Sequence, residues 1–219
     1  FYILINPTYI YANDSFEEWK KNFFNQAISQ GVSEKTLSIV INNLEFLPKV
    51  IEYDRYQPEF YEDTFTYISK RANLKRIKIG VQTFNKNSAL IVEVEKKFEV
   101  EKELLLSLMG IETNFGKYLG KMDILSSLAT LSFDKRRSEF FTKELIIALK
   151  LIDNKKIKVE ELYGSWAGAF GNFQFMPSTI KNNAIDYNND DLIDLKSVED
   201  SFASAANYLS KMGWDTHGK

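Results

Sequence analysis

One glutamate stands at the end of an apolar stripe that has helical spacing. Leu105 and Leu108 precede Glu112 by seven and four residues, which places the three side chains on one face of a helix. A carboxyl group on an apolar face loses hydration, so its charged form is disfavoured and its pKa is expected to rise. A carboxyl group that stays protonated near neutral pH can act as a general acid, for example toward a glycosidic oxygen. The alternative is a glutamate that turns outward into solvent or pairs with a nearby lysine.

Small residues gather in one segment, residues 164–171 (GSWAGAFG), which runs into Asn172, Gln174 and Phe175. Small residues let a backbone approach a ligand closely, and Ser165, Asn172 and Gln174 offer neutral hydrogen-bonding groups beside aromatic rings. This combination suits an uncharged polar ligand such as a sugar, and these side chains are expected to contact it. The alternative is a tight connection between helices in which the glycines serve packing.

An acidic segment carries oxygen side chains at the spacing of a calcium loop. Asp186, Asn188, Asp190 and Asp194 occupy positions 1, 3, 5 and 9, and the carbonyl group of Leu192 would supply position 7. The pattern predicts a structural calcium ion. The alternative is an acidic turn that faces solvent.

Two positions of this loop depart from the calcium pattern. Position 6 is Asp191, where glycine usually makes the sharp turn, and position 12 is Ser197 instead of glutamate. Asp200, three residues further on, is a candidate substitute for the missing ligand.

A pair of arginines, Arg136 and Arg137, stands just before Glu139 and Phe140. The pair is suited to contact an anionic ligand, and the alternative is a set of surface ion pairs.

The composition of the 219 residues limits the chemistry. There is no cysteine, which excludes disulfides, thiolate metal sites and a cysteine nucleophile, and the single histidine, His217, makes a histidine-based triad or zinc site a poor fit. A formal net charge of −2 argues against a nucleic-acid partner. The chemistry must therefore use carboxylates, amides, hydroxyls and basic side chains.

Helical spacing and helix caps recur along the chain, so the predicted fold class is mainly α. A capping box at Ser15 predicts a first helix that ends at Gly31, and Ser33 is expected to cap a second helix that Pro48 stops. A third helix is expected through Phe60, Thr64 and Ile68.

The second half of the chain shows the same signals. A long amphipathic helix is expected over residues 77–98, and the helix of Glu112 should end near Asn114 and Gly116. Asp123 and Ser197 are expected to cap further helices.

Residues 1–14 begin with an uncharged apolar run (FYILINPTYIYA). The run is too short to span a bilayer, which needs about 20 apolar residues. It is expected to be the remnant of a secretory signal, or alternatively an ordinary strand or a packing arm at the N-terminus.

Several segments recur in the same order in the membrane-bound lytic murein transglycosylase B family, and the chain resembles this family of peptidoglycan-cleaving enzymes over nearly its whole length after residue 15. The matching segments are residues 54–60 (DRYQPEF), 110–116 (GIETNFG), 129–133 (ATLSF) with Arg136 and Arg137, 164–169 (GSWAGA), 174–178 (QFMPS), the acidic loop and 206–208 (ANY).

The resemblance implies a lysozyme-like helical catalytic domain with an additional helical subdomain. Residues 15–100 would form an N-terminal helical part and residues 101–219 a catalytic core, truncated at its C-terminus because the family continues with further cleft residues. The resemblance places the single catalytic acid and base on Glu112. It assigns substrate contacts to Ser165, Gln174, Arg136, Arg137 and Tyr208, and places the calcium loop over Asp186, Asn188, Asp190, Leu192 and Asp194.

The implied reaction cleaves the β-1,4 bond between N-acetylmuramic acid and N-acetylglucosamine in peptidoglycan glycan strands and leaves a 1,6-anhydromuramic acid product. It requires no cofactor, and it implies an exported protein of the bacterial periplasm or cell envelope. One alternative is a lysozyme-type hydrolase, which needs a second carboxylate roughly 5–10 Å away, such as Asp123 or Asp134. The other is a non-catalytic glycan-binding module.

Overall fold

The computed structural model describes the backbone of residues 7–56 and 63–216, with side chains from residue 15 onward in these ranges. The chain is mainly helical, as the sequence predicts. Its elements are α1 (Pro7–Ser29), α2 (Glu34–Ile41), α3 (Pro48–Arg55), α4 (Thr64–Arg71), α5 (Leu74–Phe98), α6 (Lys102–Thr113), β1 (Met122–Asp123), α7 (Ile124–Phe133), α8 (Ser138–Asp153), the 3₁₀ turn η2 (Val159–Glu161), β2 (Tyr163–Gly164), α9 (Pro177–Asn183) and α10 (Val198–Lys211).

Three of the predicted helix caps are confirmed. The side chains of Ser33, Asp123 and Ser197 each accept a hydrogen bond from the backbone N–H three residues later, at the starts of α2, α7 and α10. Asn114 adopts a left-handed conformation (φ 51°) at the end of α6, where the sequence places the helix end. Local capping chemistry therefore sets most of the helix boundaries.

Two of the predicted boundaries are wrong, and proline is the reason in both cases. Helix α1 begins at Pro7, so Ser15 lies inside the helix and residues 7–14 form no strand, while residues 1–6 lie outside the described residues. Pro48 does not stop a helix, because α2 has already ended at Ile41 and Pro48 starts α3. Proline is favoured in a first turn, where its missing N–H needs no partner. The third predicted helix is α4, and Phe60 lies outside the described residues.

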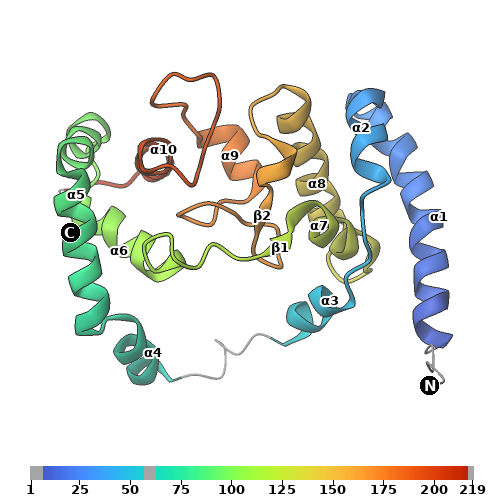
Figure 1. Ribbon diagram of the computed structural model, residues 1–219, viewed down its shortest axis with the longest axis horizontal. Coiled ribbons are helices and arrows are strands. Elements are labelled where there is room, and N and C mark those ends of the chain that lie inside the picture. Colours follow the sequence, from blue (N-terminus) through green and yellow to red (C-terminus); the bar gives the residue numbers. More distant parts are fainter. Residues whose placement is uncertain (1–6, 57–62, 217–219) are drawn as a thin grey trace.

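Helix α7 is the centre of the hydrophobic core, since every residue from Ile124 to Ser132 is buried. It packs against α8 and α3, and α10 packs against α5, α6 and α9. Helices α1 and α2 lie on one side of these central helices and α5 lies on the other, so the helices that precede α6 flank the core from two sides (Figure 1). The boundary predicted near residue 100 stays a prediction.

Helices α5 and α6 approach each other through one aromatic ring. A Cβ atom added to Gly80 in α5 would lie 2.9 Å from the Phe115 ring, and one added to Gly110 in α6 would lie 2.8 Å from the same ring. Phe115 thus occupies the space that side chains at both glycines would need. This packing fixes the C-terminal end of α6, which carries Glu112.

Candidate active site

Glu112 is the penultimate residue of α6. Glu112 is exposed to solvent, which agrees with the alternative of a glutamate that turns outward. The surrounding protein atoms nevertheless displace part of its hydration, and this desolvation raises the pKa of its carboxyl group. Leu105 is buried and Leu108 is partly buried on the same helix. Within the described residues no hydrogen bond or ion pair reaches the Glu112 carboxyl group. The position at a helix end and the direction of the pKa shift agree with the sequence-based expectation, and the catalytic role of Glu112 stays a prediction.

The end of α6 is tied to the loop that follows the glycine-rich segment. The Thr113 hydroxyl donates to the backbone carbonyl oxygen of Asn172 at 2.9 Å, and it accepts the N–H of Gly116 at 3.0 Å. Thr113 is buried at 1% exposure, so these bonds are sheltered from water. The residue next to Glu112 is therefore held against residues 164–175.

The glycine-rich segment starts in a short antiparallel pair. Strands β1 and β2 pair Met122 with Gly164, and a Cβ atom on Gly120 would lie only 2.1 Å from the Gly164 carbonyl oxygen. Gly120 also has a φ of +87°, so both space and conformation require glycine there. The Ser165 hydroxyl oxygen accepts the N–H of Ala169 at 3.0 Å, which leaves its hydrogen available to a ligand.

Gln174 closes the turn that follows. Residues Phe170 and Phe175 form an isolated antiparallel bridge around it, and Gln174 itself has a φ of +50°. Its side-chain amide group donates to the carbonyl oxygens of Gly171 at 2.9 Å and Leu119 at 3.3 Å. The amide N–H groups of Gln174 thus hold two loops together, and in the described part of the chain its side-chain carbonyl oxygen takes no hydrogen bond.

Asn172 is placed differently from the sequence-based expectation. Its side chain is 3% exposed, and its amide group donates to the carbonyl oxygens of Lys196 and Ser197 and to the Ser201 hydroxyl at 3.0–3.3 Å. These bonds fix the turn to the start of α10. Asn172 therefore faces the protein interior and supports the turn from behind.

Two aromatic residues of the expected site lie side by side. The rings of Phe175 and Tyr208 are 5.7 Å apart between centroids, so α10 contacts the turn of Gln174. Phe175 is buried and Tyr208 is half-buried, which leaves Tyr208 as the member of this pair that solvent reaches.

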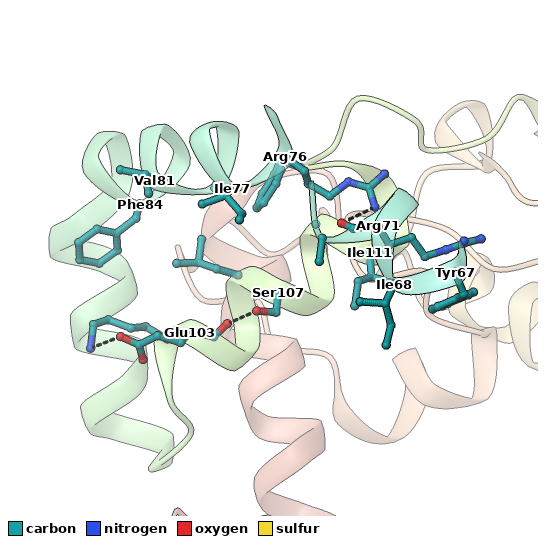
Figure 2. A pocket seen from close by; sticks show the side chains of 16 residues that line it. Tyr67, Ile68, Arg71, Arg76, Ile77, Val81, Phe84, Glu103, Ser107 and Ile111 are labelled. Atoms are coloured by element: carbon teal, nitrogen blue, oxygen red, sulfur yellow. Dashed lines mark hydrogen bonds and ion pairs between the residues drawn. The ribbon is translucent and has the colours of Figure 1, made fainter. Parts of the chain in front are cut away.

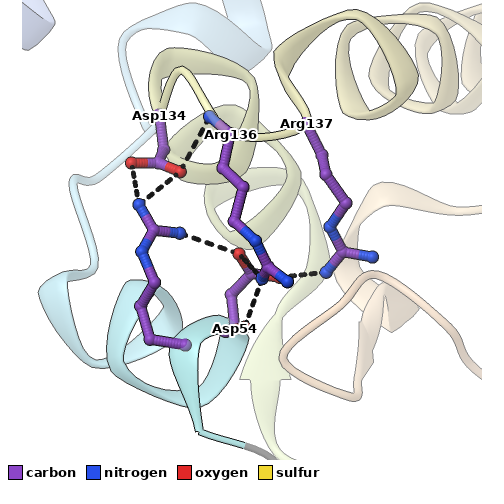
Figure 3. A network of polar contacts seen from close by, with 5 residues as sticks. Asp54, Asp134, Arg136 and Arg137 are labelled. Carbon is purple, nitrogen blue, oxygen red and sulfur yellow. Dashed lines mark hydrogen bonds and ion pairs between the residues drawn. The ribbon is translucent and has the colours of Figure 1, made fainter.

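The two arginines lie in a charge cluster at the turn between α7 and α8. Arg136 and Arg137 both form ion pairs with Asp54 of α3, while Arg55 pairs with Asp134 (Figure 3). Both arginines therefore form ion pairs, which is the alternative that the sequence left open. The outer parts of both guanidinium groups still face solvent, since the Arg136 and Arg137 side chains are 47% and 39% exposed.

The acidic loop is closed by its own hydrogen bonds. The Asp186 carboxylate accepts the N–H groups of Asp190 and Asp191 at 3.1 and 2.8 Å, and Asp190 accepts the N–H of Leu192 at 2.9 Å. Asp194 accepts the N–H of Lys196 at 2.8 Å. Oxygen donors suit calcium, but among the residues whose side chains the structure describes no three acidic or histidine side chains converge on one metal position. The donor chemistry fits the ion, and the arrangement of the carboxylates does not.

Asp200 binds the backbone of this loop through hydrogen bonds. It is fully buried and accepts the N–H groups of Tyr187 and Asp194, both at 2.8 Å. Burial raises the pKa of its carboxyl group, the charge of Asp186 adds to this effect, and the loop N–H groups oppose it.

Tyr187 ties the loop to α5. Its hydroxyl donates to Glu93 at 2.6 Å, and the ammonium group of Lys97 lies 4.5 Å from its ring centroid. Burial and the bond to Glu93 raise the pKa of Tyr187 to about 12, so its hydroxyl stays a donor at neutral pH.

A cavity of about 540 Å³ opens between α4, α5 and α6 (Figure 2). Its lining is apolar and includes Ile68, Ile77, Val81, Phe84, Leu106 and Ile111. Gly110 and Ile111 line it, whereas Glu112 is not among the described residues that do. The cavity and Glu112 therefore both lie along α6, but Glu112 does not line the cavity.

Sequence reasoning missed two contributors to the site. The ring of Tyr53 in α3 lies 6.4 Å from the ring of Trp166, which places α3 against the glycine-rich segment. Asp54, the next residue, holds the arginine pair. The only sequence signal for Asp54 was the match of residues 54–60 to the family of peptidoglycan-cleaving enzymes.

Comparisons with known proteins show which family the chain resembles. The sequence model of the transglycosylase SLT domain family matches residues 15–219 of this chain. Membrane-bound lytic murein transglycosylase B of Escherichia coli (strain K12) is 36% identical over 149 residues, which are 68% of this chain and 41% of that protein.

Solved structures are similar along most of the chain. SltB3 from Pseudomonas aeruginosa, in complex with NAG-NAM-pentapeptide, has a TM-score of 0.89 and 32% identity, covering 93% of this chain and 55% of that one. The Escherichia coli lytic transglycosylase Slt35, in complex with calcium, has a TM-score of 0.80 and 29% identity, covering 91% and 64%. The predicted lysozyme-like helical fold is thereby confirmed.

The chain spans about half the length of these relatives, with 41% of the Escherichia coli protein and 55% of SltB3 covered. The family model nevertheless covers residues 15–219, which is nearly the whole sequence. The chain therefore belongs to the transglycosylase SLT domain family, as its resemblance to the murein transglycosylase B enzymes predicts.

Proposed function

We propose that this chain is the catalytic part of a peptidoglycan lytic transglycosylase, with Glu112 as its single acid and base. It would cleave the β-1,4 bond between N-acetylmuramic acid and N-acetylglucosamine and form a 1,6-anhydromuramic acid end. Family membership supports the reaction class. SltB3, which is similar to this chain, was solved in complex with NAG-NAM-pentapeptide, and this supports a glycan strand with attached peptides as the substrate.

The observation that carries the proposal is the environment of Glu112. Desolvation raises the pKa of its carboxyl group, and no described cation pairs with it to keep it ionised. A larger fraction of molecules is then protonated near neutral pH, which a general acid needs. Thr113 and Phe115, which follow Glu112, fix the end of this helix through a hydrogen bond to Asn172 and through packing against Gly80 and Gly110.

In the proposed mechanism one carboxyl group acts first as an acid and then as a base. Glu112 donates it to the glycosidic oxygen as the bond to C1 of the muramic acid breaks, and the acetamido group of the substrate stabilises the positive charge that develops there. The ionised Glu112 then accepts the proton of the muramic 6-hydroxyl group as that oxygen bonds to C1. The hydroxyl of Ser165 and the free carbonyl oxygen of Gln174 would hold the sugar in place, which is a proximity contribution.

The carboxylates that a hydrolase would need are engaged elsewhere. Asp123 accepts the N–H of Ser126 at 2.6 Å as a helix cap, and both oxygens of Asp134 accept hydrogen bonds from Arg55. Both carboxylates therefore have structural roles, as a helix cap and in an ion pair. Family membership favours the transglycosylase over the lysozyme-type hydrolase.

Two further assignments belong to this proposal. A structural calcium ion would require Asp186, Asn188, Asp190, Asp194 and the Leu192 carbonyl to converge, and it would take no part in the reaction; the calcium complex of Slt35 supports such a site. The expected location is the periplasm or cell envelope, in line with the membrane-bound Escherichia coli relative. The part of the chain that the structure describes holds no helix of the length and apolarity needed to cross a bilayer.

The test is the mass of the products that the chain releases from purified peptidoglycan. Anhydromuramic products weigh one water less than hydrolytic products, because the 6-hydroxyl group replaces water as the nucleophile. Products that all contain the added water would identify a hydrolase. Binding of the glycan with no release of products would identify a non-catalytic module.

A further inference from the structure

Helix α4 and the first half of α5 form a corner at one edge of the molecule (Figure 1). The structure describes every residue of α4, and none of them is buried. In α5 the first buried residue is Ile91, more than four turns after the start of the helix. The side chains of this corner are therefore largely available to a partner.

Large apolar side chains project into solvent at this corner. Phe65 of α4 is 80% exposed and Leu74 of α5 is 85% exposed, the two highest fractions among the large apolar side chains that the structure describes. Ile68, Ile77 and Val81 are about half exposed. A gathering of exposed apolar side chains is typical of a surface that binds a membrane or another protein.

These side chains belong to one continuous surface. Residues three apart on a helix are neighbours, so Phe65 lies beside Ile68, and Leu74 lies beside Ile77. Ile68 and Ile77 both line the apolar cavity between α4, α5 and α6 (Figure 2). Phe65 and Leu74 are not among the described residues that line this cavity. The apolar surface thus runs from the cavity outward over both helices.

The same two helices carry a concentrated positive charge. Residues 64–92 contain six lysines and arginines and no aspartate or glutamate, although the whole chain has a formal net charge of −2. Lys75 and Lys78 are exposed, and Lys78 is a neighbour of Leu74 one turn further along α5. Within the part of the chain that the structure describes, no carboxylate pairs with Lys75, Arg76 or Lys78. Cations beside exposed apolar side chains are typical of helices that bind anionic lipids.

The turn between α4 and α5 is held by three hydrogen bonds. Asn73 accepts the N–H of Arg76 at 3.0 Å as the cap of α5, and its amide group donates to the carbonyl oxygen of Lys70 at 2.8 Å. The Arg76 guanidinium group donates to the carbonyl oxygen of Arg71 at 3.1 Å. These bonds fix the two helices relative to each other, so the surface needs little ordering when it binds a partner.

We propose that this corner binds the surface of an anionic lipid bilayer. Phe65 and Leu74 insert among the acyl chains, while Lys75, Arg76 and Lys78 contact the phosphate groups of the lipids. A helix of another protein, lying in the cavity, is the alternative occupant. It would leave Phe65 and Leu74 uncovered, because they lie outside the cavity. A bilayer covers the apolar side chains and contacts the cations together, and this favours the lipid.

Binding at this corner leaves the candidate acid accessible. Gly110 and Ile111 of α6 line the cavity, whereas Glu112 is not among the described residues that do. The inference goes beyond the proposed function, since lipid binding involves no proton transfer. Substitutions at the corner should accordingly leave the turnover of a soluble glycan fragment unchanged.

The experiment measures co-sedimentation of the chain with vesicles of phosphatidylglycerol and phosphatidylcholine in equal parts, and with vesicles of phosphatidylcholine alone. The wild type should bind the mixed vesicles at least ~10-fold more tightly, because only these carry negative charge. Phe65→Ser combined with Leu74→Ser should weaken binding to the mixed vesicles at least ~10-fold, because less apolar area leaves water. Lys75→Gln combined with Lys78→Gln should weaken it by a similar factor of about 10 or more.

Matched control variants lie on α1 and α2, on the other side of the core (Figure 1). Ile39→Ser removes an apolar side chain that is 53% exposed, and Lys21→Gln combined with Lys35→Gln removes two exposed charges. Both controls should bind the mixed vesicles like the wild type, and every variant should keep the wild-type melting temperature because its positions are exposed. Equal losses in the controls, or binding that the Phe65 and Leu74 substitutions leave unchanged, would overturn the inference.

A second measurement uses the wild-type chain alone. Hydrogen exchange of the backbone amides in residues 64–84 should slow when mixed vesicles are added, while exchange in α1 and α2 stays the same. Protection elsewhere with none at the corner would overturn the inference. A chain that does not bind the vesicles would also overturn it. If that chain sediments as a dimer that Leu74→Ser converts to a monomer, the partner is a second copy of the chain.

Discussion

The hydroxyl group of Thr113 donates to the backbone carbonyl oxygen of Asn172, 59 residues further along the chain, at 2.9 Å. This single buried bond joins the helix that carries Glu112 to the turn that carries Gln174. The position of the acid relative to the proposed sugar-binding groups thus depends on it.

Replacing Thr113 with valine tests this connection. The variant keeps the shape but leaves the Asn172 carbonyl and the Gly116 N–H without their partner. We expect the free energy of unfolding to fall by about 1–3 kcal/mol, as is usual for an unsatisfied buried group, and kcat to fall with it. Urea unfolding and product release measure the two effects.

The control for this variant is Ser107→Ala. The Ser107 hydroxyl is exposed on the same helix and donates only to the Glu103 carbonyl. Its loss should leave both stability and kcat close to the wild-type values. A loss of stability as large as that of the Thr113 variant would show that the connection to Asn172 is not special.

Replacing Glu112 with glutamine removes the carboxyl group that would donate a proton to the glycosidic oxygen and then accept the proton of the 6-hydroxyl group. Activity on peptidoglycan should fall at least ~10²–10⁴-fold, the range typical of general acid–base catalysis. Glycan affinity should survive, because the amide fills the same space. Glu103→Gln, on the exposed side of the same helix, is the control and should keep full activity. A Glu112→Gln variant that retains near-normal turnover would exclude Glu112 as the acid.

The raised pKa of Glu112 predicts a pH dependence of stability with a definite sign. A group whose pKa is higher in the folded than in the unfolded state stabilises the fold below its unfolded pKa, and this contribution is lost as the pH rises through its folded pKa. Charged Glu112 is therefore unfavourable at neutral pH. Glu112→Gln should melt at a higher temperature than the wild type at pH 7.

This gain should shrink as the pH is lowered below the unfolded pKa, where Glu112 is protonated in both states. Melting curves of the two proteins between pH 3 and pH 8 would measure the difference. The activity of the wild type should likewise decline as the pH rises through the folded pKa, since the protonated form is the donor. A melting-temperature difference that does not vary with pH would contradict the role of desolvation.

Calcium should stabilise the folded chain if it binds the acidic loop. At a free concentration of 100 times Kd it would contribute about 2.7 kcal/mol, which corresponds to a melting-temperature rise of roughly 5–10 °C for a chain of this size. The measurement is thermal unfolding of chelator-treated protein with and without calcium. Asp190→Asn can keep the bond to the Leu192 N–H and should lose the response. An unchanged melting temperature in the wild type would rule out the calcium site.

The parts of the fold that the sequence predicts are those set by neighbouring residues. Ser33, Asp123 and Ser197 cap their helices through bonds to residues three positions away, so the local sequence contains all of the information. The start of α1 at Pro7 was missed, because Ser15 offers an equally good cap signal and proline is also favoured in the first turn of a helix.

The candidate site was predictable where residue type and helix periodicity suffice, as for Glu112. It was not predictable where contacts join distant segments. Asp54 and Arg136 lie 82 residues apart, and no local pattern shows that they pair. Asn172 has the chemistry of a ligand-binding amide, but its burial against α10 is a property of the tertiary structure.

The ring of Phe115 makes three positions dependent on one another. Because it takes the space of a side chain at both Gly80 and Gly110, enlarging either glycine is penalised as long as the ring is present. The penalty should disappear when position 115 carries a small side chain, so the order in which substitutions accumulate matters. Replacing Phe115 with a smaller residue first would open a cavity beside the helix of Glu112, a step that trades stability for the freedom to vary at both glycines.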